Sequence, residues 1–277
     1  MKKISLGYST CPNDTFIFDA MVHHKIDTEG LDFDIVMADV EELNKKAIKQ
    51  ELDVTKISYH VYSKIANHYC LLDSGSALGK NNGPILVSKH KIYPDEVNDI
   101  KIAIPGENTT ANMLFSIAYP YAKKKKEYLF SDIEDVVLSN EMDAGLIIHE
   151  NRFTYEKKGL QKIVDLGEFW EKETKLPIPL GGIAVKRDLD HEVQLKINRI
   201  LRKSVEYAFE NPKSAYPYIK KYAQEMDEDV MYKHIELYVN QFTIDLGKDG
   251  RDAVKMLYKK ASSLGIIPEL NQQIFLT

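Results

Sequence analysis

Short apolar runs alternate with helical patterns over most of the chain, and this alternation most limits the folds available to it. Strands are expected at Lys3–Tyr8, Leu31–Met37, Asp53–Ser58 and Tyr69–Asp73, with helices between them. Strands that alternate with helices are typical of a largely parallel sheet covered by helices. The first part of the chain is therefore predicted to form an α/β lobe.

The same pattern starts again after a polar connector at Lys89–Asp99. A strand at Lys101–Ile104 opens the second unit, and the strand Ile183–Lys186 is expected to return to the first. The fold class is thus an α/β clamshell of two lobes with mixed, mostly parallel sheets and a helical C-terminal segment from Asp188 onward. The predicted boundaries are residues 1–88 plus 186–277 for lobe 1 and residues 89–185 for lobe 2. Because domain interfaces favour small-molecule pockets, a ligand cleft is expected between the lobes.

Two loops carry hydroxyls, amides and small residues directly before a helix, at Ser9–Thr15 and Pro105–Ala111. Free backbone N–H groups at a helix start can bind an anion. Either loop alone is better interpreted as an ordinary capped turn, but one such loop in each lobe suggests that both face one ligand. The candidate lining is polar, with two basic candidates, and comprises Ser9, Thr10, Asn13, Lys56, Ser58, Thr109, Thr110 and Arg152.

A further candidate follows the apolar run Ala144–Ile148, which predicts a buried strand. His149 would lie at the carboxyl end of this strand, where ligands bind in open α/β sheets. An imidazole there can act as a general base near neutral pH. A histidine that merely caps the strand and bonds to backbone fits its position equally well.

Composition and motifs exclude several classes of protein. The net charge of −5 and the absence of a basic stripe argue against nucleic acid as a partner. No apolar run suits a membrane span or a signal peptide, so no membrane association and a cytosolic location are expected. Phosphate-loop, dinucleotide, Ser-His-Asp and metal-ligand spacings are missing. Cys11 and Cys70 are too few for a disulfide scaffold, and Cys11 is best interpreted as a small buried residue.

The residues alone therefore predict a two-lobed binder of a small anionic molecule with a candidate histidine base. A non-catalytic, small-carboxylate-binding protein is the plainest alternative. Such solute-binding modules are usually secreted, whereas no signal peptide is expected here.

Several motifs resemble one known family. They are Ser9–Phe18, Thr55–Tyr59, Gly75–Gly83, Pro105–Ala111, Ala144–Tyr155, Val164–Gly167 and Leu176–Gly181. On these motifs the chain resembles the 1,4-dihydroxy-6-naphthoate synthase family of the futalosine route to menaquinone. The resemblance is strong over roughly the first two-thirds of the chain and looser in the C-terminal helices.

This resemblance implies a periplasmic-binding-protein-like fold of the second structural type. It implies a carbon–carbon lyase that converts cyclic dehypoxanthinylfutalosine into 1,4-dihydroxy-6-naphthoate, with no metal or organic cofactor. His149 matches the family's proposed proton acceptor, and the substrate-contacting positions match Lys56, Ile57, Ser58, Thr110 and Ala111. Chorismate dehydratase, a menaquinone enzyme of related fold, remains an alternative. Glu150 and a backbone carbonyl are both open as the group that fixes the His149 tautomer, and the oligomeric state is not indicated.

Overall fold

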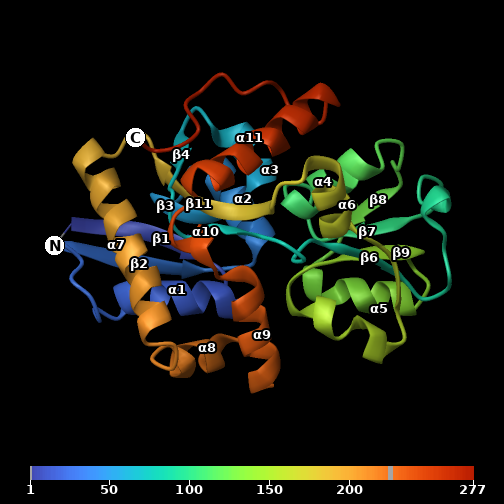
Figure 1. The fold of residues 1–277 in the computed structure, drawn as a ribbon, viewed down its shortest axis with the longest axis horizontal. Coiled ribbons are helices and arrows are strands. Elements are labelled where there is room, and N and C mark those ends of the chain that lie inside the picture. Colours follow the sequence, from blue (N-terminus) through green and yellow to red (C-terminus); the bar gives the residue numbers. More distant parts are fainter. Residues whose placement is uncertain (1, 224–226) are drawn as a thin grey trace.

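The computed structural model describes residues 2–223 and 227–277, with the side chain of Glu150 also outside the described part. Two sheets lie side by side, each covered by helices, and form the two lobes seen in Figure 1. The predicted two-lobed α/β fold is therefore confirmed at the level of its sheets.

The first sheet has the strand order β2-β1-β3-β11-β4, with β5 paired to β11. Its strands are β1 (Lys2–Tyr8), β2 (Leu31–Met37), β3 (Val54–Ser58), β4 (Tyr69–Leu71), β5 (Ala77–Gly79) and β11 (Ile178–Lys186). The helices between them are α1 (Pro12–Val22), α2 (Val40–Ile48) and α3 (Tyr59–Ile65). The core strand β3 is buried at every position, as the apolar pattern of a central strand requires.

The second sheet has the strand order β10-β6-β9-β7-β8. Its strands are β6 (Ile85–Ser88), β7 (Ile102–Ile104), β8 (Lys125–Glu127), β9 (Ala144–Ile147) and β10 (Gln161–Asp165). The helices of this lobe are α4 (Thr110–Ala118), α5 (Ile133–Leu138) and α6 (Leu166–Thr174). The edge strand β8 ends at Glu127, and Phe130 begins a short 3-10 turn.

Two strands, β6 and β11, do not lie in the sheet of the lobe to which the predicted boundaries assign them. β6 pairs with β9 and β10 of the second sheet, whereas β11 pairs with β3, β4 and β5 of the first over its whole length. The pairing places residues 85–88 with lobe 2 and residues 178–185 with lobe 1. A strand's own apolar pattern does not specify its partner, so the sequence could not fix these boundaries closely.

Every antiparallel pair in the described sheets includes β6 or β11. Parallel pairing is confined to β1–β3 and β7–β9. The sheets are therefore mixed, as expected, but with a smaller share of parallel pairs. The strands β6 and β11, next to the interlobe crossings, are antiparallel to their neighbours. They connect the lobes directly, without a crossover helix.

The described part of the chain after β11 is largely helical up to Ser263, as predicted, but residues 264–277 do not continue the helical pattern. The helices are α7 (His191–Glu210), α8 (Tyr216–Tyr222), α9 (Glu228–Tyr238), α10 (Gln241–Ile244) and α11 (Gly247–Ser263). α1 packs against α7, α8 and α9, and α11 packs against β11 and α4. The C-terminal segment thus covers the first lobe and extends to the second (Figure 1).

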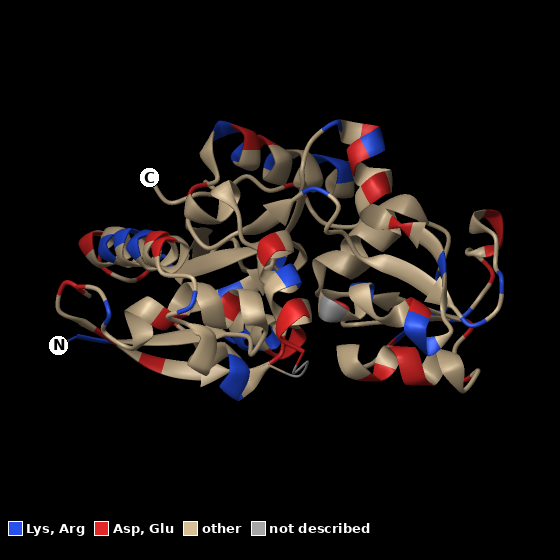
Figure 2. Ribbon diagram, turned by 60° about the horizontal axis from the view of Figure 1, so that its bottom comes forward, with Lys and Arg blue, Asp and Glu red and all other residues tan. Residues whose placement is uncertain are grey.

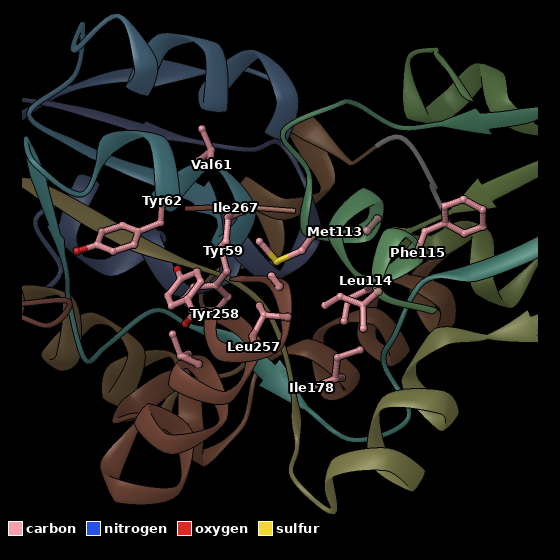
Figure 3. Packing of buried hydrophobic residues seen from close by; sticks show 14 of the residues in the cluster. Tyr59, Val61, Tyr62, Met113, Leu114, Phe115, Ile178, Leu257, Tyr258 and Ile267 are labelled. Carbon is pink, nitrogen blue, oxygen red and sulfur yellow. The ribbon is translucent and has the colours of Figure 1, made fainter. Parts of the chain in front are cut away.

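One apolar cluster continues from lobe 1 into lobe 2. Figure 3 shows Met113 and Leu114 of α4 in the same cluster as Tyr59 of α3 and Tyr258 of α11. The rings of Tyr59 and Tyr258 meet edge to face with centroids 6.5 Å apart. The lobes therefore share part of their hydrophobic core.

Polar contacts join the lobes beside this cluster. The Asn108 amide of lobe 2 donates to the buried Glu41 carboxylate of α2 over 2.5 Å, and His60 Nδ1 of α3 donates to the Thr109 carbonyl over 3.2 Å. Gly106 has φ +145°, and a Cβ there would lie 2.6 Å from the Glu41 side chain, so glycine permits this close approach. On the surface, acidic and basic residues are interspersed along the helices in the view of Figure 2.

Candidate active site

A cavity lies between the two sheets and is lined from both lobes. It contains about 690 Å³ of empty space including its mouth. Its lining is Ser9, Asn13, Asp14, Val40, Lys56, Ile57, Ser58, Ala77, Asn82, Pro84, Thr109, Thr110, Ala111, Ile148, His149, Leu180, Gly181 and Tyr238. Both loops expected to face a ligand therefore contribute to one cavity.

His149 reaches this cavity from the end of β9, where a 3-10 turn (His149–Phe153) begins. Its backbone has φ +58°, a conformation that a non-glycine residue seldom adopts and that often marks a functional position. The His149 Nδ1 atom lies 3.5 Å from the Cys11 sulfur, and the Phe130 ring meets the imidazole at a centroid distance of 5.0 Å. The ring is thus held by contacts on more than one side.

The floor of lobe 1 contains a buried ion pair. Lys56 Nζ lies 2.9 Å from the Asp14 carboxylate, and the two side chains are 8% and 2% exposed. Asp14 also accepts from the Ser9 hydroxyl over 2.7 Å and from the Asn13 amide nitrogen over 2.9 Å. A buried charge needs such partners, so these groups hold one another in place.

Ser58 lies beside this pair at the start of α3. Its hydroxyl accepts from the Asn44 amide over 3.0 Å, and its backbone N–H donates to the Asn44 carbonyl oxygen over 2.9 Å. Asn44 in turn donates to Glu41, whose pKa is raised by burial. The end of β3 is therefore fixed by α2.

Lobe 2 presents the start of α4 to the cavity. Thr109 is the N-cap, and its hydroxyl accepts from the Asn112 N–H over 3.2 Å. Thr110 and Ala111 form the first turn, where backbone N–H groups have no partner within the helix. The Thr110 hydroxyl donates to the Leu180 carbonyl of β11 over 2.5 Å. These groups give the cavity an environment that favours an anion.

His234 of α9 lies next to the cavity and was not anticipated from the sequence. It is fully buried, and its ring lies 6.1 Å from the His149 ring with an interplanar angle of 19°. Burial, with the nearby His149 and Lys56, lowers the pKa of His234 well below its ordinary range. No local motif marks this histidine, because it lies within an ordinary amphipathic helix.

Cys11 also has a place that its sequence context did not reveal. It is buried, as expected for a packing residue, but it is the N-cap of α1 and faces His149 across the cleft. The helix starts at Pro12. This leaves Asn13 and Asp14 in the first turn, where their side chains contribute to the cavity.

Two candidates from the sequence do not line the cavity. Arg152 donates to the Asp165 carboxylate over 2.8 Å and to the Gly83 carbonyl over 2.5 Å. It is therefore occupied in holding the start of α6, where Asp165 is the N-cap. Thr10 lies in the first loop but is not among the lining residues. The structure brings together Ser9, Asn13, Lys56, Ile57, Ser58, Thr109, Thr110, Ala111 and His149.

Within residues 2–223 and 227–277, no group of three or more His, Cys, Asp or Glu side chains is arranged to hold a metal ion. In the same part of the chain, no helix combines the length and apolar character needed to span a membrane.

Comparisons with known proteins give one consistent result. A family described as "Menaquinone biosynthesis" matches residues 4–263. A 1,4-dihydroxy-6-naphthoate synthase of Thermus thermophilus is 39% identical over 275 residues, which cover 99% of this chain and 100% of the relative. A synthase of the same name from Streptomyces coelicolor is 39% identical over 272 residues, covering 96% of this chain and 95% of the relative.

Solved structures agree on the fold. A crystal structure of a protein from Archaeoglobus fulgidus has a TM-score of 0.90 at 38% identity, covering 96% of this chain and 98% of that one. An alkanesulfonate-binding protein of Xanthomonas axonopodis has a TM-score of 0.72 at only 10% identity, covering 97% and 95% of the two chains. The second likeness concerns the fold alone, and it confirms the periplasmic-binding-protein-like architecture.

Proposed function

The chain belongs to the menaquinone biosynthesis family that includes the 1,4-dihydroxy-6-naphthoate synthases, and we propose that it converts cyclic dehypoxanthinylfutalosine into 1,4-dihydroxy-6-naphthoate. The enzyme class follows from relatives that match nearly the full length of the chain. The substrate is the one that the family resemblance implies, whereas the residue roles rest on the chemistry of the cavity. The observation that carries them is the position of His149, which lies in the cavity with a backbone conformation that non-glycine residues seldom adopt.

His149 is the proposed general base. It takes a proton from the substrate, and the electron pair left behind drives cleavage of a carbon–carbon bond. The sugar-derived fragment leaves, the remaining ring system becomes aromatic, and the imidazolium returns its proton to the products. Because Nδ1 faces the Cys11 sulfur, Nε2 is the nitrogen that we assign to the proton transfer. Positioned general-base catalysis contributes ~10²–10⁴-fold to a rate.

The anionic group of the substrate is assigned to the start of α4. Lys56 is already paired with Asp14, so it adds little net positive charge for a ligand. The first-turn N–H groups at Thr110 and Ala111 and the hydroxyl of Ser58 would supply the hydrogen bonds instead, while Ser9, whose hydroxyl already donates to Asp14, would contact the substrate as a lining residue. The remaining lining includes apolar side chains such as Ile57 and Leu180, which suit a flat ring system. We also assign Asn13 to this substrate-binding set, and the cytosolic location stays a prediction.

The test is product analysis by mass and fluorescence with purified protein and cyclic dehypoxanthinylfutalosine. Wild type should release 1,4-dihydroxy-6-naphthoate, and His149→Ala should lose nearly all turnover, by ~10²-fold or more, while substrate binding survives. His24→Ala is the control, since His24 has a side chain that is 53% exposed on the surface of lobe 1.

Each other outcome has a defined meaning. Binding without product in wild type would support a non-catalytic carboxylate-binding protein. Turnover of chorismate in place of the futalosine-derived substrate would support the dehydratase. Full activity in His149→Ala would exclude His149 as the base and leave the family assignment intact.

A further inference from the structure

His234 and His149 come from different lobes, yet their rings lie nearly parallel at 6.1 Å. His149 follows β9 of the second sheet, whereas His234 belongs to α9, which packs on the first lobe through α1. His234 also contacts the ring of Tyr238, which lines the cavity, with centroids 4.7 Å apart. The buried histidine is therefore in contact with the proposed base and with a second residue of the cavity wall.

A chain of hydrogen bonds fixes the proton on His234. The Asp14 carboxylate, paired with Lys56, can only accept hydrogen bonds, so the Asn13 side chain must turn its Nδ2 toward Asp14. The Asn13 Oδ1 atom then faces His234 Nε2 at 2.8 Å and can only accept. His234 must consequently carry its proton on Nε2.

This histidine is also held in its uncharged form. It is fully buried, and the ammonium of Lys56 and the ring of His149 both disfavour a second proton on it. Among the side chains that the structure describes, the Cys11 thiol and Asp14 of α1 and the Tyr238 hydroxyl of α9 are further titratable groups around the two rings. A charged His234 would repel an imidazolium at His149, whereas a neutral one does not.

We propose that His234 is a positioning residue, which holds an uncharged ring in a single tautomer against His149 and links the base to the Asn13–Asp14–Lys56 network. The inference rests on the proposed function, in which His149 is the base. His234 is not among the residues that line the cavity, so it acts on the reaction through His149 and Asn13. The catalytic site is thereby assembled from both lobes.

Two substitutions separate this role from simple packing. His234→Gln places an amide nitrogen near the position of Nε2 and can still donate to Asn13, whereas the shorter His234→Asn cannot reach it. His234→Asn should lose about 10–100-fold in kcat, because small displacements of a catalytic group have effects of this size, with little change in KM. His234→Gln should retain most of the activity.

The pH profile supplies a second measurement. The shorter side chain of His234→Asn should admit water to His149, and water favours the imidazolium form, so the acid limb of kcat/KM should move to higher pH in this variant. In His234→Gln the limb should stay close to that of wild type. A purely structural role would instead lower the unfolding midpoint of both variants and leave the limb in place, and this result would overturn the proposal.

Nitrogen-15 NMR of the histidine side chains tests the proposal without substrate. The chain has eight histidines, and the His149→Ala and His234→Asn variants assign the two signals. In wild type, His234 should show a neutral Nε2–H tautomer that does not titrate between about pH 5 and about pH 9. A titrating His234, or a His149 signal unchanged in His234→Asn, would overturn the positioning role even if wild type makes the naphthoate. Failure of wild type to make any product would overturn the proposed function instead.

Discussion

The polar side chains around the cavity are paired with one another across large distances in sequence. Asn13 bonds to His234, Cys11 faces His149, and Lys56 pairs with Asp14. Each pair satisfies a group that would be unfavourable if buried alone. The reactive geometry therefore depends on partners as much as on the residues that face the substrate.

Arg152 pairs with the Asp165 carboxylate, which is only 3% exposed, and this pairing predicts the effect of removing the arginine. Arg152→Ala should lower the free energy of unfolding by about 3 kcal/mol, because it leaves a buried carboxylate without its cation. Urea unfolding measures this effect. Arg199→Ala is the control, since its pair with Glu29 lies on the surface and should contribute at most about 1 kcal/mol. A variant of normal stability with a strongly raised KM would instead support Arg152 as a substrate-binding residue.

Among the secondary-structure elements, α2 has a special role because it connects the cavity to the second lobe. Its first turn carries Val40 to the cavity and Glu41 to Asn108, and Asn44 holds Ser58. The helix starts at an N-cap, in which the Asp39 side chain accepts from the N–H groups of Glu41 and Glu42 over 2.8 and 3.2 Å. Fraying of this start would release contacts to both lobes.

Removal of this cap should therefore destabilise the protein measurably. Asp39→Ala should lower the free energy of unfolding by about 1 kcal/mol, the usual contribution of an N-cap, whereas Asp39→Ser should retain most of it. Thermal or urea unfolding of the two variants beside wild type gives the comparison. Equal stability of Asp39→Ala and wild type would mean that the first turn of α2 is held by its interlobe contacts alone.

For the whole molecule, the contact between the lobes is partly apolar and partly ionisable. The shared cluster around Tyr59, Met113 and Tyr258 joins the lobes by burial, which responds weakly to pH (Figure 3). Glu41 lies beside it as a buried carboxylate that accepts from Asn108 of the other lobe. Burial raises the pKa of Glu41 above its ordinary value of 4.5.

The sign of the resulting pH dependence follows from linkage. Between the ordinary and the raised pKa, the folded state binds the proton of Glu41 more tightly than the unfolded state does, so stability from this group falls as pH rises. Wild type should thus lose stability relative to Glu41→Gln as pH increases from about 4.5 to neutral. Urea unfolding of both proteins across this range measures the difference.

The neighbouring Glu42→Gln is the control on the same helix, because the side chain of Glu42 is 56% exposed. Its difference from wild type should vary less with pH. If wild type instead gained stability relative to Glu41→Gln as the pH rises, the amide donors would stabilise the Glu41 carboxylate by more than burial destabilises it.

The sequence by itself determined the elements and the places where they meet the ligand. Alternating apolar runs and helix caps are local signals, so they predicted two α/β lobes, the loops before α1 and α4, and His149 at the end of a buried strand. These features can be predicted from the periodicity of apolar residues and the chemistry of a few adjacent residues.

Only the tertiary structure decided which distant groups are partners. Asn13 and His234 are 221 positions apart, and Cys11 and His149 are 138 apart, so no local period relates them. The same reason explains Arg152, whose cationic group could serve a ligand or a buried carboxylate until packing placed Asp165 beside it. Hydrogen bonds and ion pairs of this kind are selected by how distant segments of the chain pack, because a buried polar group takes whichever partner the fold brings within reach.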